Sequence, residues 1–382
     1  MKTVGLIVNP IAGMGGSVGL KGTDGEMVKR ARLLGARPVT PERAVDFLAH
    51  VTHGEDIVWL AAPGAMGAAY LAPLGFTVSV VDGHATAHAT AHASAHDPNS
   101  ETTADDTRRI AVAMVRAGVD LLVFVGGDGT ARDICDAIGV ERPVVAVPTG
   151  VKVYSSAFAL SPRAAAVMVD AFVEGVGLTE VEVLDIDEDA FRDNRLQARH
   201  YGFLLAPDVG AQLQPGKEGT HATPDTAENQ RDIAAAFIEE METDVLYLLG
   251  PGTTVQAIAK DLTVEKTLLG IDALLNGQII ARDLNERQIL TMLETHSQAK
   301  IVVTPLGGNG FILGRGNKPF TPEVIRRVGL DRIMVVATEQ KAQQIGLLRV
   351  DTGDAALDAQ LSGYREVMIG YGIARAMKVQ AA

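Results

Sequence analysis

Residues that are scarce or missing narrow the functions open to this 382-residue chain. Cys135 is the only cysteine, so no disulfide can form within the chain, and this composition fits a reducing cytoplasm. No run approaches the roughly 18 consecutive apolar residues of a membrane span. Aspartate and glutamate (47) outnumber lysine and arginine (34), and the net charge of −13 argues against a general nucleic-acid binder. We therefore expect a cytoplasmic protein whose partners are neither nucleic acids nor membranes.

Two further features are missing. The pair Gly216-Lys217 does not complete a Walker motif, because Glu218 stands where a serine or threonine would hold Mg²⁺. With one cysteine, no Cys/His pair has the spacing of zinc ligands. The apolar segment at residues 4–8 is too short for a signal peptide and predicts a first strand instead.

The chain contains enough apolar residues to form the cores of two domains, since 47% of its residues are hydrophobic. Over about the first 155 residues, short apolar runs alternate with helix-like segments, which predicts an α/β domain with a doubly wound parallel sheet. Ligands in such sheets bind beyond the carboxyl ends of the strands. Strands are expected at 4–8, 57–61, 77–81, 121–125 and 144–147, and helices at 26–34, 41–49, 103–117 and 131–138.

The chain changes character after about residue 150. Following a helix expected at 162–174, strands dominate, which predicts a β-rich second domain over residues 156–334. Thr321 and Pro322 are residue types that favour the N-cap and the first turn of a helix, so a helix is expected to start there. A strand at 333–338 is expected to return to the first domain. The other expected strands are 181–186, 201–206, 245–249, 267–271, 278–281 and 301–304.

The most informative segment is residues 121–133, where an apolar strand meets a glycine-rich turn and a helix. This arrangement is typical of phosphate sites, since glycine lets a ligand approach the backbone N–H groups. A carboxylate in such a turn would repel phosphate, so Asp128 is expected to pair with a metal or a hydroxyl group, and either role indicates phosphoryl transfer. Capping of the following helix is the structural alternative. The turn consists of Gly126, Gly127, Asp128, Gly129 and Thr130.

Further glycine-rich turns follow predicted strands and are candidate nucleotide or phosphate contacts. Asn9 and Pro10 follow the first strand, and Gly150 and Lys152 follow the strand at 144–147. The lysine could neutralise phosphate charge, and Arg315 could clamp a phosphate with two hydrogen bonds. Ordinary turns and N-caps would explain each segment on its own. The candidates in the second half are Gly252, Thr253, Thr254, Gly307, Gly308 and Asn309.

Residues 84–96 are of low complexity, with a histidine at every fourth position. In a helix these imidazoles would form one stripe that could bind a transition metal. A surface loop bounded by Gly83 and Pro98 is the simpler interpretation, so no metal site is expected there. The histidines are His84, His88, His92 and His96.

Taken together, these segments resemble the ATP-NAD kinase family, in the superfamily of NAD kinases and diacylglycerol kinases. The turn at 126–130 is similar to the signature of that superfamily. The resemblance spans both halves of the chain. It also includes residues 9–16, 101–108, 150–152, 250–254 and 304–317.

The resemblance implies an NAD kinase-like fold, with an N-terminal nucleotide-binding domain, a β-rich C-terminal domain and a tail from about 335 to 382 that returns to the first domain. It implies transfer of the ATP γ-phosphoryl group to the 2′-hydroxyl of the adenosine ribose of NAD, which yields NADP. Asp128 would act as the base, and Mg²⁺ would bridge the phosphates. Family members form homodimers or tetramers, so a homo-oligomer is expected.

Two alternatives stay open. NAD kinases carry an Asn-Glu pair that contacts the nicotinamide half of NAD, and no such pair lies between Asp128 and Tyr201. A kinase of another acceptor, a lipid or a small molecule, is therefore one alternative. Against a lipid acceptor, aromatic residues make up only 4% of the chain, and Ala131-Arg132 stand where lipid kinases place Asn-Glu. The other alternative is a non-catalytic nucleotide-binding accessory or sensor protein.

Overall fold

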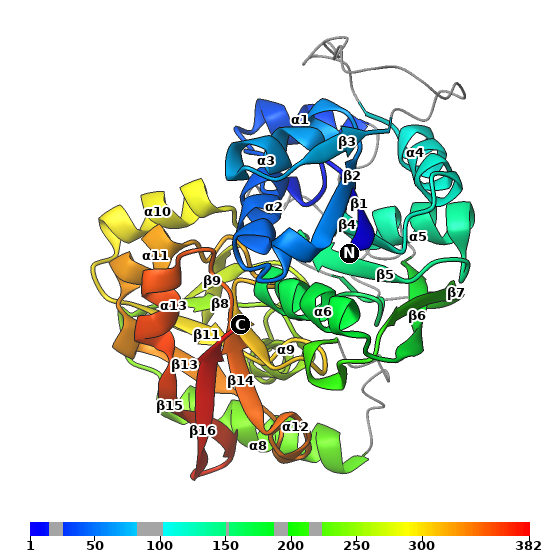
Figure 1. The fold of residues 1–382 in the computed structure, drawn as a ribbon. Coiled ribbons are helices and arrows are strands. Elements are labelled where there is room, and N and C mark those ends of the chain that lie inside the picture. The colour runs from blue at the N-terminus through cyan, green and yellow to red at the C-terminus, as the bar shows by residue number, and fades with distance from the viewer. Residues whose placement is uncertain (15–25, 82–101, 150–152, 187–197, 214–223) are drawn as a thin grey trace.

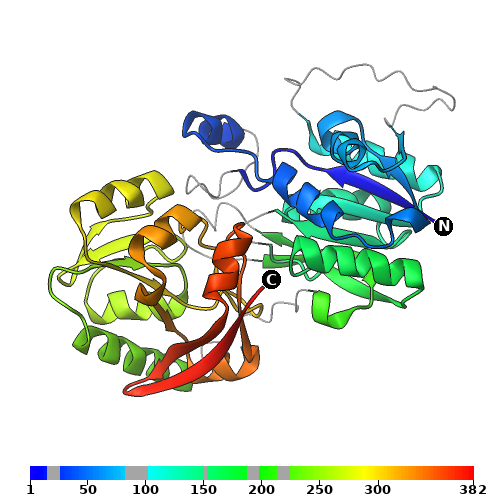
Figure 2. The same cartoon turned by 60° about the vertical axis from the view of Figure 1, so that its left-hand side comes forward.

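The structure, a computed structural model, describes residues 1–14, 26–81, 102–149, 153–186, 198–213 and 224–382 (Figure 1). Each half of the chain forms its own body of helices and strands, and the two bodies lie side by side (Figure 2). Several predicted residues lie outside the described part. They are Gly150, Lys152, His84, His88, His92 and His96.

The first half forms a five-stranded parallel sheet with the order β3-β2-β1-β4-β5, which confirms the predicted α/β class. All residues of β4 and β5 are buried, as continuous apolar strands covered on both faces require. The chain leaves β1 for β2 and β3 on one side and later adds β4 and β5 on the other, so the switch point lies between β1 and β4. The strands are β1 Lys2–Val8, β2 Ile57–Ala61, β3 Val78–Val80, β4 Leu121–Gly126 and β5 Val144–Pro148.

Helices cover this sheet in pairs, with α4 packed beside α5 and α2 beside α6 (Figure 1). Their starts follow local chemistry. Thr103 and Asp106 form a capping box at α4, and the Ser161 hydroxyl accepts a hydrogen bond from Ala164 N at α6. The helices are α1 Glu26–Leu33, α2 Thr40–Ala49, α3 Ala68–Leu71, α4 Ala104–Arg116, α5 Asp128–Ile138 and α6 Pro162–Glu174.

The first domain continues past the boundary expected at residue 155. An antiparallel pair, β6 (Leu178–Ile186) and β7 (Ala198–Pro207), packs against α5 and β5. Val183 and Leu204 from this pair are fully buried in the same core as β1 and β4. Residues up to about 213 therefore belong to the first domain.

The second half is built around a nine-stranded mixed sheet, which confirms the β-rich C-terminal domain. The strand order is β10-β9-β8-β11-β13-β15-β16-β14-β12. Alternate residues of β8 face different cores: Leu248 packs into one apolar cluster, and Tyr247 and Leu249 into another. The strands are β8 Leu246–Leu249, β9 Asp272–Leu275, β10 Gln278–Ala281, β11 Ala299–Val303, β12 Phe311–Leu313, β13 Ile333–Val336, β14 Leu347–Val350, β15 Gly363–Gly370 and β16 Ile373–Ala381.

The expectation that residues 335–382 return to the first domain is wrong. The apolar strand β13 pairs with β11 and β15, and β16 pairs with β15 and β14, so all of them belong to the second sheet. Each of these strands finds its hydrogen-bond partners there, which leaves none to extend the first sheet.

Helices also flank the second sheet, more of them than the sequence pattern indicated. The strand expected at 267–271 is a loop, and β9 begins only at Asp272. No helix within the described residues is long and apolar enough to cross a membrane. The helices are α8 Pro224–Glu239, α9 Thr253–Asp261, α10 Glu286–Thr295, α11 Pro322–Val328, α12 Glu339–Ile345 and α13 Ala355–Leu361.

Candidate active site

The glycine turn between β4 and α5 is tightly packed against the loop after β1. A side chain at Gly126 would place its Cβ 2.4 Å from the Thr130 hydroxyl oxygen, so only glycine fits there. Asn9 Nδ2 donates to that same hydroxyl at 3.0 Å, and Asn9 N donates to Val125 O at 2.9 Å. The predicted segments 9–10 and 126–130 are thus brought together at the switch point of the sheet.

Asp128 is the first residue of α5, and its carboxylate is held by a loop that follows β5. Tyr154 N donates to Oδ2 at 2.8 Å, while Ser155 N and Oγ donate to Oδ1 at 2.9 and 2.6 Å. Gly127, and not Asp128, is the N-cap of α5. Capping therefore does not explain Asp128, whose carboxylate has a fixed orientation set by a different part of the chain.

A strand behind the loop supports this arrangement. Ser155 Oγ also accepts a hydrogen bond from Leu184 N at 3.0 Å, which ties the loop to β6. The Tyr154 side chain is 6% exposed. Burial, and next the charge of Asp128, raise the pKa of the Tyr154 hydroxyl above its ordinary value. Asp128 therefore lies beside a neutral phenol rather than another anion.

The loop after β5 meets the same glycine turn. Thr149 N donates to Gly126 O at 3.0 Å, and a Cβ on Gly13, which has φ +70°, would lie 2.4 Å from Thr149 O. The loops after β1, β4 and β5 thus converge at one edge of the sheet. Thr149 Oγ1 is buried there and has no hydrogen-bond partner within the described part of the chain.

The glycine-rich loops of the second domain form a separate group. Gly252 has φ +120°, and a Cβ there would lie 2.5 Å from Thr304 Cγ2. Thr253 is exposed at the start of α9, and its hydroxyl accepts a hydrogen bond from Gln230 Nε2 at 3.4 Å, whereas Thr254 is buried. Of the loop after β11, Gly307 and Gly308 are exposed, and Asn309 O accepts a hydrogen bond from Arg349 at 2.9 Å.

Two polar contacts link the domains beside this site. Arg43 of α2 pairs with Asp351, which follows β14, at 2.7 Å. Lys318 Nζ, from the loop after β12, donates to Thr149 O at 3.1 Å. Since Thr149 N also donates to Gly126 O, the second domain is connected to the backbone of the glycine turn through Thr149.

No group of three or more His, Cys, Asp or Glu side chains within the described ranges could enclose a metal ion. Mg²⁺ keeps several waters and binds nucleotide phosphates with only one or two carboxylates, so it does not need such a group. Around the turn, the Asp128 carboxylate lies beside the backbone of the glycines. This arrangement fits a metal ion that arrives bound to the nucleotide.

Sequence reasoning found the glycine turn but missed the residues that hold it. Tyr154 and Ser155 follow the predicted strand at 144–147, and nothing in their local sequence distinguishes them. Lys318 stands three residues beyond Arg315 in the glycine cluster, which was a usable signal. Arg43 and Asp351 are 308 positions apart, and only the folded chain shows them as a pair.

Comparison with known families agrees with this architecture. Residues 4–176 match the ATP-NAD kinase N-terminal domain, and residues 242–379 match the ATP-NAD kinase C-terminal domain. The chain belongs to the ATP-NAD kinase family. Family membership by itself does not name a phosphoryl acceptor. A comparison with curated protein sequences finds no match.

Among solved structures, the chain is similar to two chains from Bacillus anthracis str. Sterne that are named as diacylglycerol kinases, one of them only as a candidate. The identities are 14% and 12%, and both TM-scores are 0.21. Each alignment covers 49% of this chain and 44% or 46% of the other. The chain therefore spans less than half the length of either structure.

Proposed function

We propose that the protein transfers the γ-phosphoryl group of ATP to the 2′-hydroxyl of the adenosine ribose of NAD, giving NADP. The observation that carries this proposal is the Asp128 carboxylate. It lies in the glycine turn at the switch point of the sheet, with its orientation fixed by Tyr154 and Ser155. A carboxylate in a phosphate-binding turn suits proton transfer from a hydroxyl acceptor.

In the proposed reaction, Asp128 accepts the proton of the attacking hydroxyl. The hydroxyl oxygen forms a bond to the γ-phosphorus, and the bond from that phosphorus to the β–γ bridging oxygen breaks, so ADP leaves. The backbone N–H groups of Gly127 and Gly129, at the start of α5, lie where the helix dipole favours anions. Bound Mg²⁺ would supply neutralisation of phosphate charge.

The acceptor is the part of the proposal that rests most on the family. Both ATP-NAD kinase domains match the chain, which supports NAD over a lipid as the acceptor. The candidate contacts of the first domain are Asn9, Pro10, Gly126, Gly127, Gly129, Thr130, Gly150 and Lys152, and those of the second are Gly252, Thr253, Thr254, Gly307, Gly308 and Asn309. A cytoplasmic homo-oligomer, a dimer or a tetramer, belongs to the same proposal.

The test is NADP formation from NAD, ATP and Mg²⁺ by the full chain, with product detected by an NADP-specific dehydrogenase. Asp128→Asn is expected to abolish the product. The matched control is Asp120→Asn, at the opposite end of β4, where the carboxylate accepts a hydrogen bond from Thr3 N. Phosphorylation of diacylglycerol but not of NAD by the wild type would contradict the proposed acceptor. Activity retained in Asp128→Asn would contradict the proposed base.

A further inference from the structure

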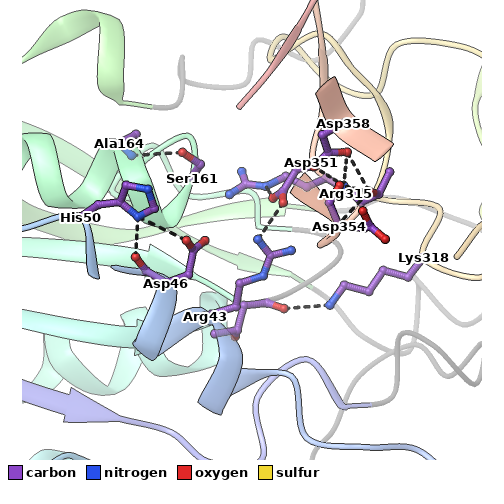
Figure 3. Close-up of polar contacts among 12 residues, drawn as sticks. Arg43, Asp46, His50, Ser161, Ala164, Arg315, Lys318, Asp351, Asp354 and Asp358 are labelled. Carbon is purple, nitrogen blue, oxygen red and sulfur yellow. Dashed lines mark hydrogen bonds and ion pairs between the residues drawn. The ribbon is translucent and has the colours of Figure 1, made fainter. Parts of the chain in front are cut away.

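A cluster of cationic side chains lies where the two domains meet (Figure 3). Arg43 comes from α2 of the first domain, and Arg315 and Lys318 come from the loop after β12 of the second. One carboxylate, Asp351, pairs with Arg43 Nη1 at 2.7 Å through Oδ1 and with Arg315 Nε at 3.5 Å through Oδ2. Arg43 and Arg315 thus share one carboxylate, and Lys318 lies within range of the charges of both.

Arg315 is the most unusual member of this cluster. The residue is 7% exposed, yet its Nη1 and Nη2 atoms are buried and find no hydrogen-bond partner among the residues that the structure describes. Its guanidinium also stacks on Phe311, with Cζ 4.7 Å from the ring centroid. Leaving two buried N–H-bearing nitrogens unsatisfied costs free energy, and native structures contain few such groups. A purely structural ion pair with Asp351 does not explain them, because it engages only Nε.

The backbone of this loop is built to hold Arg315 in place. Gly314 has φ +91°, and a Cβ there would lie only 1.7 Å from Asp351 O. Gly316 has φ +86°, and a Cβ there would lie 2.2 Å from Leu306 Cδ1. Glycine on both sides therefore lets the chain pass against β14 and Leu306, which fixes the guanidinium at the junction.

The cluster adjoins the candidate active site through Lys318 and Thr149. The lysine donates to Thr149 O, and the Thr149 hydroxyl is a second buried polar group for which the described ranges provide no partner. Burial, and next the charge of Arg43, lower the pKa of Lys318 to about 7. Burial likewise lowers the pKa of Arg315 to about 10. Buried cationic side chains and polar atoms without a described partner therefore occur together near the glycine turn.

We propose that Arg315, with Lys318 and the Thr149 hydroxyl, binds one phosphate group of a nucleotide's di- or triphosphate chain. The identity of the anion rests on the proposed function, whose substrates both carry such chains. A phosphate offers three oxygens, which suits the two guanidinium nitrogens together with a second cation. The bound anion would also provide the missing partners of Arg315 and bridge the two domains.

The first test is calorimetric titration of the full chain with inorganic pyrophosphate, ATP and adenosine. Arg315→Gln is expected to weaken binding of pyrophosphate and ATP by about 10- to 100-fold, since charge-assisted hydrogen bonds are lost. Adenosine binding should not change. The matched control is Arg326→Gln, whose exposed guanidinium pairs with Asp354 at 2.7 Å. Equal pyrophosphate affinity in the wild type and Arg315→Gln, or no binding to the wild type, would overturn the proposal.

A second variant protects the test against misfolding. If Arg315→Gln lowers the melting temperature strongly, Lys318→Met decides, with an expected loss of about tenfold in pyrophosphate affinity and no loss for adenosine.

Kinetic measurements on both variants then separate the proposed phosphate site from the proposed function. A raised KM for ATP assigns the phosphate to the donor, and a raised KM for NAD assigns it to the acceptor. NADP formation with unchanged KM values in both variants would refute the phosphate site alone. Pyrophosphate binding that depends on Arg315 in a chain that makes no NADP would refute only the proposed reaction.

Discussion

The turns at 126–130 and 250–254 follow the same plan, a buried strand that runs into glycines and then a helix, but they differ in what they present. The first places a carboxylate, Asp128, at the start of α5 and fixes it with Tyr154 and Ser155. The second places two threonines at the start of α9. In our proposal, this local architecture serves proton transfer in the first domain and only binding in the second.

The glycines of the two turns also do different work. Gly127 has an extended backbone with φ −119°, which any residue can adopt, and a Cβ there would lie within 4 Å of no described residue. Gly252 has φ +120° and would collide with Thr304. Space at Gly127 is thus available to a ligand, whereas Gly252 is required by the fold itself.

The largest expected effect on stability concerns the ion pair between Arg43 and Asp351, which joins the two domains. Asp351→Asn leaves Arg43 and Arg315 buried without their carboxylate, and we expect a loss of about 3–5 kcal/mol in the free energy of unfolding by urea. Asp354→Asn is the control, because asparagine also caps α13 and the pair with Arg326 is exposed, so it should cost less than about 1 kcal/mol. Similar losses in both variants would contradict this role of Asp351.

Acidification should reproduce part of the Asp351→Asn effect. Burial acts to raise the pKa of Asp351, but Arg43 and Arg315 outweigh it, and the pKa lies below its ordinary value. The stability from this carboxylate is therefore complete above its unfolded-state pKa near 3.8 and is lost as the pH falls through the lower folded-state value. The Asp351→Asn variant should lack that part of the loss of stability on acidification.

Alanine substitutions at the two glycines sharpen the comparison directly. Gly252→Ala should lower the free energy of unfolding by about 1–3 kcal/mol, because alanine is strained at this φ and meets Thr304. Gly127→Ala should change it by less than about 0.5 kcal/mol but should weaken ATP binding, since the Cβ occupies the proposed ligand space. Thermal unfolding and calorimetry on the same preparations measure both quantities. If Gly252→Ala were stable and Gly127→Ala destabilised, the result would contradict our assignment of Gly252 to the fold and Gly127 to ligand space.

A smaller effect is expected from the support of Asp128. Ser155→Ala removes the hydroxyl that donates to Asp128 Oδ1 at 2.6 Å, and kcat should fall about tenfold as the carboxylate loses its fixed orientation. Ser156→Ala is the matched control, because its hydroxyl contacts only the backbone of Glu182 in the described contacts. Equal kcat values for the two variants would show that the Ser155 hydroxyl does not position the base.

The last prediction is a pH dependence of stability that comes from Lys318. Because burial lowers its pKa from 10.5 to about 7, the unfolded chain carries a proton that the folded chain lacks between these values. Stability should therefore rise as the pH increases through that window. The groups that influence Lys318 are Arg43, Arg315, Asp351 and Glu42. Lys318→Met should reduce this rise without removing it, since burial also lowers the pKa values of Lys266 and Lys341 to about 8.

The first domain was largely predictable from sequence because its elements are local. Predicted strands at 57–61 and 121–125 correspond to β2 and β4, and the helix at 26–34 corresponds to α1. The second sheet was less predictable. Its strand order joins β16 to β14 and β11 to β13, and no local pattern shows which strands will pair across such distances.

The candidate site shows the same division. Gly126 to Thr130 were identifiable, because a strand, glycines and a helix start are adjacent in the sequence. The partners of Asp128 come from a loop 26 and 27 residues later, and the partner of Arg43 lies 308 residues away. These contacts depend on how whole elements pack, so a single sequence does not contain a local signal for them.

The most direct test of the central claim, that chemistry resides at Asp128 and not merely nucleotide binding, compares kcat with affinity in one variant. In Asp128→Asn, we expect kcat for NADP formation to fall by about 10²- to 10⁴-fold, the usual contribution of a general base. Calorimetric Kd values for ATP and NAD should stay within about threefold of the wild type. A parallel loss of affinity and kcat, or an unchanged kcat, would contradict the account.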